Sequence, residues 1–149
     1  MKTITSQWFL CKIRYEKTME DGSQKRVTEQ YVVDALSFTE AEARITSEMS
    51  AYISGEFEIA EIDRAVFHEV FFIDEQANTD ARWYKSKLQF ITIDEMTEKE
   101  KRTSAYYLVE GCSLENARGN IDKVMTGTML DYVITSVSET PVIDVFRHT

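Results

Sequence analysis

The chain has 149 residues, of which 43% are hydrophobic and 29% are charged, a composition that is ordinary for a soluble globular protein and sufficient for a core without disulfides or metals. The net charge of −9 argues against a general binder of duplex DNA or of membrane surfaces, because clustered lysine and arginine are needed to hold phosphate groups. Two cysteines, no apolar run of membrane-spanning length and no apolar signal-peptide core at the start lead us to expect a cytoplasmic protein without a membrane span.

Residues 8–15 alternate between apolar and polar side chains, which predicts a half-buried strand. The apolar face of this strand is expected to consist of Phe9, Cys11, Ile13 and Tyr15. The pair Asp21-Gly22 favours a tight turn with positive φ, so residues 27–36 are predicted to return as a second strand.

The apolar period then changes to that of a helix. Ser37 and Glu40 have the spacing of a capping box. An apolar stripe begins at Phe38 and continues to Tyr52, which predicts an amphipathic helix between them. We expect Gly55 to follow the last turn as the C′ residue.

Two further strands are predicted before the middle of the chain. They cover residues 57–64 and 66–73, and the alternation slips between Ile59 and Ile62, which indicates a β-bulge. Residues 74–80 are expected to form a linker.

The same order of elements returns after the linker. Strands are predicted over residues 84–90, 103–111, 132–137 and 142–146, and a helix over residues 114–129. Ser113 is placed to cap the helix. Pro141 lies between the last two strands, where a break in hydrogen bonding is tolerated.

The two halves are also related residue by residue. With shifts of 75 or 76 positions, 13 of 48 aligned pairs are identical, where unrelated sequences of average composition give about three. The sequence therefore predicts an α+β protein with an internally duplicated ββαββ unit, two helices and antiparallel sheets. We expect one pseudo-twofold domain over residues 1–149, with repeats at about 7–73 and 82–147.

The last strand of each repeat is expected to cover a sheet edge, since open edges promote aggregation. Residues 66–73 are expected to form an antiparallel hairpin with residues 82–90, and residues 142–146 to lie beside residues 7–15 by symmetry. The predicted core consists of Phe9, Ile13, Ala41, Ile45, Met49, Ile59, Leu88, Ala117, Ile121, Met125 and Ile134.

No familiar catalytic motif is present in the sequence, and two histidines with two cysteines are too few for a plausible transition-metal site. We therefore predict no catalytic residue, no metal ligand and no cofactor, and expect a protein that is not an enzyme. Glu56, Glu58, Glu61 and Asp63 on the third strand have the chemistry of a hard-cation site or an acid–base pair. The simpler interpretation is a solvated strand face, since the second repeat lacks these acids.

The most suggestive pattern lies on the first strand of each repeat, on the face opposite the predicted apolar face. Tryptophan and basic residues recur there in both repeats. Such a face can stack bases and hold phosphates, or anchor a protein partner. Alternatively, each indole packs against the next strand with lysine stems over it. Exposed indoles favour a contact surface and buried indoles favour packing. The candidate binding residues are Trp8, Lys12, Arg14, Trp83, Lys85 and Lys87.

Four runs, at residues 8–18, 27–44, 82–85 and 142–146, resemble the signatures of a family, the domain of unknown function numbered 4494. The resemblance covers nearly the whole chain. It implies a small intracellular protein of bacterial or phage origin, and it supplies no activity, cofactor or catalytic residue.

Three functions remain open from the sequence. The first is a non-enzymatic protein that binds an unknown protein partner or a second copy of itself, as in a homodimer. The second is a nucleic-acid-associated accessory protein that uses the tryptophan and lysine faces, although the net charge of −9 disfavours it. The third is an enzyme or a small-molecule-sequestering protein with a site between the repeats.

Overall fold

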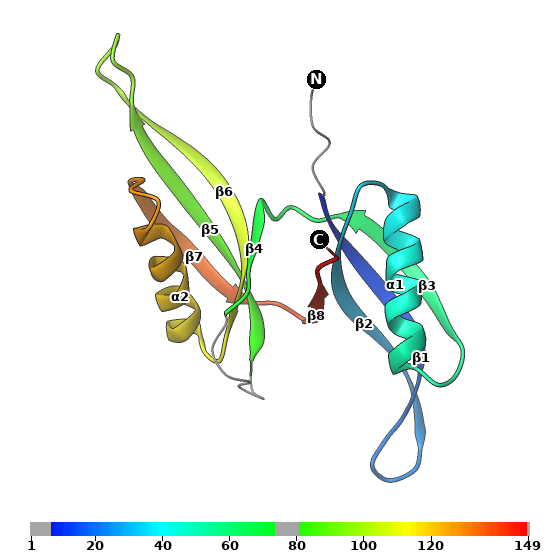
Figure 1. The fold of residues 1–149 in the computed structure, drawn as a ribbon. Coiled ribbons are helices and arrows are strands. Elements are labelled where there is room, and N and C mark those ends of the chain that lie inside the picture. Colours follow the sequence, from blue (N-terminus) through cyan, green and yellow to red (C-terminus); the bar gives the residue numbers. More distant parts are fainter. Residues whose placement is uncertain (1–6, 74–80, 149) are drawn as a thin grey trace. The chain divides into compact units, whose positions relative to one another are not determined.

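The computed structural model describes residues 7–73 and 81–148, and it shows an α+β protein with two helices and two four-stranded sheets (Figure 1). The expected linker at residues 74–80 lies outside the described residues. In chain order the elements are β1 (Gln7–Thr18), β2 (Gln24–Ala35), α1 (Phe38–Tyr52), β3 (Phe57–Arg64), β4 (Glu69–Phe71), β5 (Arg82–Ile93), β6 (Glu100–Gly111), α2 (Leu114–Thr126), β7 (Tyr132–Glu139) and β8 (Val142–Phe146).

The chain forms two compact units, and the second is inserted into the first. Unit 1 consists of Met1–Ala65 and Pro141–Thr149, and unit 2 of Val66–Thr140. The strand order is β3-β1-β2-β8 in unit 1 and, read in the same sense, β7-β5-β6-β4 in unit 2. Each sheet therefore takes one strand from the other sequence repeat: β8 joins the first sheet, and β4 joins the second.

The pairing of β4 and β8 corrects the expected antiparallel arrangement. β4 pairs in parallel with β6, not with β5, and β8 pairs in parallel with β2, not with β1. The expected places are occupied, because β1 lies between β2 and β3, and β5 lies between β6 and β7. The other edges of the two sheets are β3 and β7.

Chain length explains why β8 leaves the sheet that contains β7. Only Thr140 and Pro141 separate β7 from β8, and the three Cα–Cα steps from the last residue of β7 to the first of β8 span at most about 11 Å. The place beside β6, which β4 occupies, lies three strand spacings from β7, which is about 14 Å. β8 therefore cannot take that place, and it completes the sheet of unit 1 instead.

Matching aromatic pairs hold the two parallel strands. Phe146 of β8 stacks on Tyr31 of β2 with ring centroids 5.8 Å apart, and Phe71 of β4 stacks on Tyr107 of β6 at 5.0 Å. Pairs of this kind contribute about 0.5–1.5 kcal/mol beyond the burial of their area. The same contact thus fixes the register of the added strand in both units.

Both helices begin where the sequence predicts. Ser37 Oγ accepts a hydrogen bond from the Glu40 N–H at 3.1 Å, and Ser113 Oγ accepts one from the Asn116 N–H at 3.0 Å. The side chains of Glu40 and Asn116 in turn accept from the backbone N–H of the residue before each cap, at 3.2 and 3.0 Å. The two helices therefore share one reciprocal cap, with asparagine replacing glutamate in the second.

The ends of the helices differ from the expectation. α1 is capped by Ile53, which has an extended backbone with φ −107°, so Gly55 lies beyond the cap and is not the C′ residue. α2 ends at Thr126, three residues before the end of the predicted helix, and Met129 lies outside the helix and is 95% exposed. Thr128 closes this turn, because its N–H and its hydroxyl both donate to the Met125 carbonyl.

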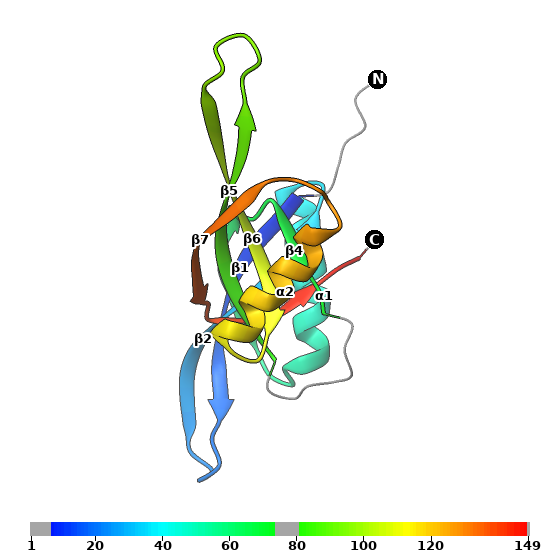
Figure 2. The same cartoon turned by 90° about the vertical axis from the view of Figure 1, so that its left-hand side faces the viewer.

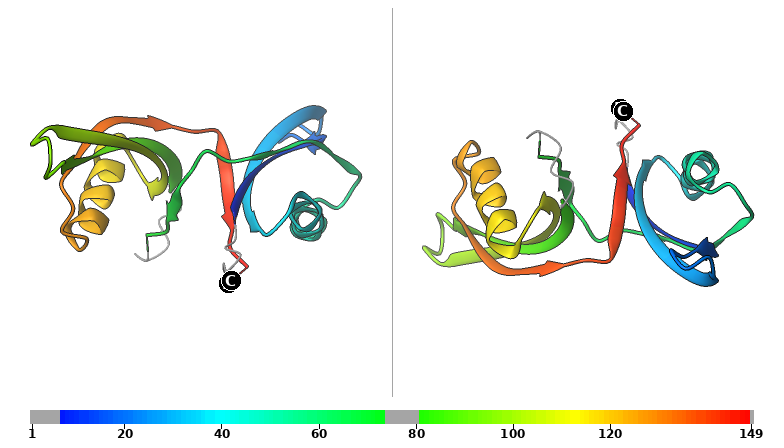
Figure 3. Two further views of the ribbon diagram at one scale, coloured as in Figure 1. Left: turned by 90° about the horizontal axis from the view of Figure 1, so that it is seen from above. Right: turned by 90° about the horizontal axis from the view of Figure 1, so that it is seen from below.

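Each helix covers one face of its own sheet, while both long hairpins extend past the helix (Figures 2 and 3). Nine predicted core residues are buried: Phe9, Ile13, Ala41, Ile45, Met49, Leu88, Ala117, Ile121 and Met125. Ile59 and Ile134 are only partly buried, because they lie on the edge strands β3 and β7. The predicted bulge is confirmed, since Ile59 and Glu61 pair with consecutive residues of β1 and leave Ala60 as the extra residue.

Truncation of the helical stripe tests the packing of each unit. Ile45→Ala and Ile121→Ala each remove a fully buried side chain between helix and sheet, so each should lower the free energy of unfolding by about 2–5 kcal/mol. Urea unfolding followed by circular dichroism measures both. Losses below about 0.5 kcal/mol at both sites, the scale of an ordinary surface substitution, would show that the stripe does not carry the core.

Fragments test the exchange of strands between repeats. Residues 66–140 contain all of unit 2, so this fragment should fold cooperatively as a monomer. Residues 1–73 contain the first sequence repeat but lack β8, so this fragment should not form a stable monomer, because β2 loses its parallel neighbour. Thermal melts and light scattering distinguish these outcomes, and a cooperative monomer of residues 1–73 would contradict the observed topology.

Candidate functional site

The six residues predicted to bind a partner lie on the sheet faces that point away from the helices. We call the residues of this face on β1 (Trp8, Leu10, Lys12 and Arg14) the β1 face. The equivalent residues on β5 (Trp83, Lys85, Lys87 and Gln89) are called the β5 face. Alternation along the strands places them there, since the intervening residues contact α1 or α2.

The two tryptophans are not equally accessible. Trp83 is only 4% exposed, and its ring packs edge-on against Phe72 at 5.4 Å. Trp8 is partly buried, with the Arg147 guanidinium 5.9 Å from its ring centroid. Trp83 therefore does not meet the exposure condition for a contact residue, and its indole is part of the packing.

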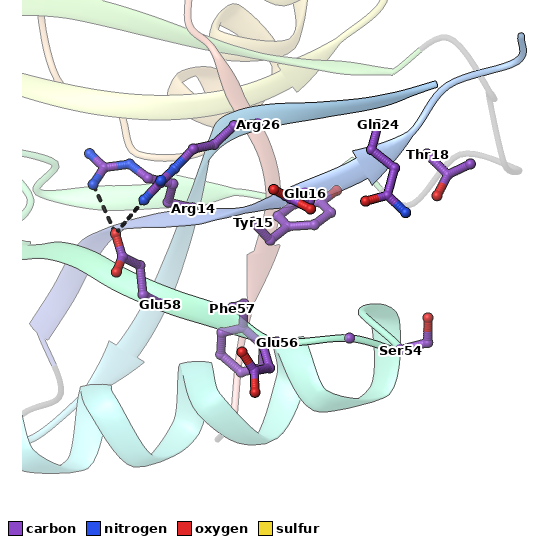
Figure 4. Close-up of a pocket in the computed structure, with 11 residues that line it drawn as sticks. Arg14, Tyr15, Glu16, Thr18, Gln24, Arg26, Ser54, Glu56, Phe57 and Glu58 are labelled. Carbon is purple, nitrogen blue, oxygen red and sulfur yellow. Dashed lines mark hydrogen bonds and ion pairs between the residues drawn. The ribbon is translucent and has the colours of Figure 1, made fainter. Parts of the chain in front are cut away.

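The cations of the β1 face are neutralised by acids on β3. Lys12 Nζ lies 3.0 Å from Glu61 Oε2, and Arg14 Nη1 lies 2.9 Å from Glu58 Oε1. Arg26 of β2 approaches the same Glu58 oxygen at 3.3 Å (Figure 4). Exposed pairs of this kind add little stability, but they leave the β1 face with few unpaired positive charges.

The β3 acids also interact with each other. A side-chain hydrogen bond with Glu61 raises the pKa of Asp63. The same bond, together with Lys12, lowers the pKa of Glu61. No three His, Cys, Asp or Glu side chains within residues 7–73 and 81–148 are arranged to hold a metal ion. In the described structure, Glu58 and Glu61 thus form ion pairs with neighbouring basic side chains.

The cations of the β5 face have different neighbours. Lys85 Nζ lies 4.8 Å and Lys87 Nζ 5.9 Å from the ring centroid of Tyr106 on β6. On the other side, the β7 residues in register with them are Ser138 and Ser136. Among the described residues, no ion pair joins either lysine to an acid. The β5 face therefore presents two positive charges where the β1 face presents ion pairs.

A charged cluster that the sequence did not predict fastens the end of the chain to unit 1. The backbone N–H of His148 donates to Asp34 Oδ1 at 2.9 Å, and its ring nitrogens lie 3.2 Å from Asp34 Oδ1 and 3.1 Å from Glu48 Oε1. Arg44 Nη1 donates to the Asp34 carbonyl oxygen at 2.6 Å. These contacts hold the residues that follow β8 against β2 and α1.

An open polar groove of about 600 Å³ lies between the β1–β2 hairpin and the start of β3 (Figure 4). Its wall contains Arg14 and Arg26, whose guanidinium groups point toward Glu58. Tyr15 also lines it, and the Tyr15 hydroxyl donates to Glu29 Oε1 at 2.7 Å, with burial and this bond raising the pKa of Tyr15 to about 12. Because both arginines that line the groove are paired with Glu58, the groove does not offer an unpaired positive charge to a ligand.

The accessibility of the tryptophans predicts different costs of truncation. Trp83→Ala should lower the free energy of unfolding by about 3–5 kcal/mol, the range for a buried aromatic side chain. Trp8→Ala should cost clearly less, because Trp8 is only partly buried. Urea melts of the two single variants give both values. Equal small losses would restore Trp83 as a candidate contact residue.

No helix in the described part of the chain is long and apolar enough to cross a membrane. Comparison with curated proteins found no match, and comparison with solved structures found none either. A family model matches residues 7–148, which is nearly the whole chain. The protein belongs to the family described as a domain of unknown function, DUF4494.

Proposed function

We propose that the protein is a non-enzymatic binding protein and that it contacts its partner through the β5 face. The observation that carries this proposal is the difference between the basic residues of the two faces, of which Lys12 and Lys87 stand at equivalent positions. Lys12 and Arg14 are ion-paired with β3 acids, whereas Lys85 and Lys87 lie on Tyr106 without an acidic partner among the described residues. A packing role alone gives no reason for this difference, but a partner with acidic groups does.

The same observations favour an acidic protein over a nucleic acid as the partner. The net charge of −9 opposes any anionic partner, and it opposes a nucleic acid most strongly because that carries a charge at every phosphate. Trp83 is buried, so the β5 face does not present an exposed indole on which bases could stack. Tyr106 is partly covered by the two lysines that approach its ring.

The proposal also interprets the two units as copies of one duplicated unit, supported by the shared strand order, caps and aromatic pairs. Self-association, a site for a small molecule between the repeats and a pseudo-twofold relation stay predictions from the sequence. A cytoplasmic location and a bacterial or phage origin also rest on the sequence alone.

Charge reversal on the β5 face, with charge neutralisation on the β1 face as the control, tests this function. The full chain is cross-linked in the cells that express it, and partners are quantified by mass spectrometry. Lys85→Glu with Lys87→Glu should abolish recovery of the specific partner, because it repels acidic groups. Lys12→Gln with Arg14→Gln should leave recovery unchanged.

Equal recovery from both double variants would refute the β5 face as the contact surface. Salt-sensitive binding of a labelled single-stranded oligonucleotide, lost in the Lys85/Lys87 variant, would instead favour the nucleic-acid function.

A further inference from the structure

The edge strands β3 and β7 have the same burial pattern but opposite chemistry. β3 carries Glu58, Glu61 and Asp63 on its outer face, whereas the residues at the equivalent positions of β7 are valine and two serines. Charged side chains on an edge strand prevent another strand from pairing with it. The β3 edge is protected in this way, and the interior of the β7 edge carries no charge.

An apolar groove of about 270 Å³ runs beside β7, between this strand and α2. Leu114 and Arg118 line it from the helix side, and Ile134 and Val137 from the strand. Leu114 is 53% exposed, so its side chain is accessible to a segment that lies in the groove.

Unit 1 has a larger side chain at the corresponding position, although it is also 46% exposed. Phe38 stands at the position equivalent to Leu114, and its ring packs edge-on against Phe9 at 5.0 Å. The Arg64 guanidinium lies 5.5 Å from the centroid of the same ring. Unit 2 has the smaller leucine, and Glu139 replaces the arginine.

The lysines of the β5 face are within reach of a strand added outside β7. Such a strand would lie two strand spacings from β5, about 10 Å away. Ser136 and Ser138, which lie between, are too short to block the path of the long stems of Lys87 and Lys85. To meet acidic side chains on the added strand, Lys85 and Lys87 would leave the ring of Tyr106 on β6 and extend over Ser138 and Ser136. The ion pair of Lys12 and Glu61 in unit 1 has the same charges on strands that are direct neighbours.

We propose that β7 is a docking edge to which an extended segment of a partner protein adds as the next strand of the sheet. The segment alternates acidic and apolar residues, with its acids directed to Lys85 and Lys87 and its apolar side chains directed to the α2–β7 groove. Backbone hydrogen bonds supply affinity in this mode, and the alternating side chains supply specificity. The inference rests on the proposed function and names its partner class.

Charge argues against a second copy of the chain as the occupant. Antiparallel pairing of β7 with β7 would bring Asp131, just before the strand, near Glu139 of the other copy. Like charges placed opposite each other destabilise a strand pair. Such a dimer would also provide no acid for Lys85 or Lys87.

Fluorescence anisotropy with a labelled peptide that alternates glutamate and valine tests the proposal on the full chain. The peptide should bind, and binding should weaken with added salt. Three control peptides should bind at least about tenfold more weakly. One alternates lysine and valine, one has the same composition in scrambled order, and one is N-methylated along its backbone.

Two variants of unit 2 copy the chemistry of unit 1. In the first, Val133→Glu, Ser136→Glu and Ser138→Asp give β7 the acids of β3, which the same position tolerates in unit 1. In the second, Leu114→Phe fills the groove. Each should remain folded by circular dichroism and weaken peptide binding by about tenfold or more. The matched change Phe38→Leu in unit 1 should leave binding unchanged.

The outcomes separate this inference from the proposed function. Loss of binding only in the Lys85/Lys87 variant, with wild-type affinity in the β7 and Leu114 variants, would keep the β5 face and overturn strand addition. Failure of the glutamate–valine peptide to bind would overturn the inference and leave the cross-linking test of the β5 face intact. A dimer that dissociates when β7 receives the acids would identify a second copy as the occupant and would also overturn it.

Discussion

Parallel pairing at one edge of each sheet is the constraint on which the rest of the structure depends. β8 pairs in parallel with β2, and β4 pairs in parallel with β6. Parallel neighbours need a long crossover between them, and the two-residue link before β8 is too short to provide one within its own repeat. The exchange of strands between repeats follows from this length.

The exchange also orders assembly along the chain. Unit 2 is a continuous stretch from Val66 to Thr140, so it is complete before β8 has been synthesised. Unit 1 is completed only when β8 joins β2, a contact with a large sequence separation and a correspondingly high loop-closure cost. The His148 cluster, in which His148 contacts Asp34 and Glu48, strengthens this long-range contact.

The two units keep the interactions that fix the backbone and differ in those that face solvent. Arg44 donates to the Asp34 carbonyl at 2.6 Å, and Asn120 at the equivalent position donates to the Glu110 carbonyl at 2.9 Å. The side-chain chemistry changes while the backbone acceptor is retained. On the outer faces, by contrast, β3 acids neutralise one basic row and β7 serines leave the other unpaired. This combination indicates one scaffold with two different surfaces.

Local pattern predicted the elements well, because strand alternation and the helical stripe depend only on neighbours along the chain. The bounds of α1, β3 and β8 and the caps at Ser37 and Ser113 are confirmed. The predicted partners of β4 and β8 were wrong, because the alternation of side chains along a strand does not determine which strand lies beside it. The ion pairs of Lys12 and the burial of Trp83 depend on that same register and packing. The role of His148 was missed because the repeat has isoleucine at the equivalent position, Ile73.

The most direct test of the account is the set of interstrand nuclear Overhauser effects in the full chain. The topology predicts parallel-strand contacts between Val32 and Val145 and between Val70 and Leu108, which are paired across β2–β8 and β6–β4. Antiparallel contacts that join β4 to β5, or β8 to β1, would contradict the exchange of strands and the inserted arrangement of the two units.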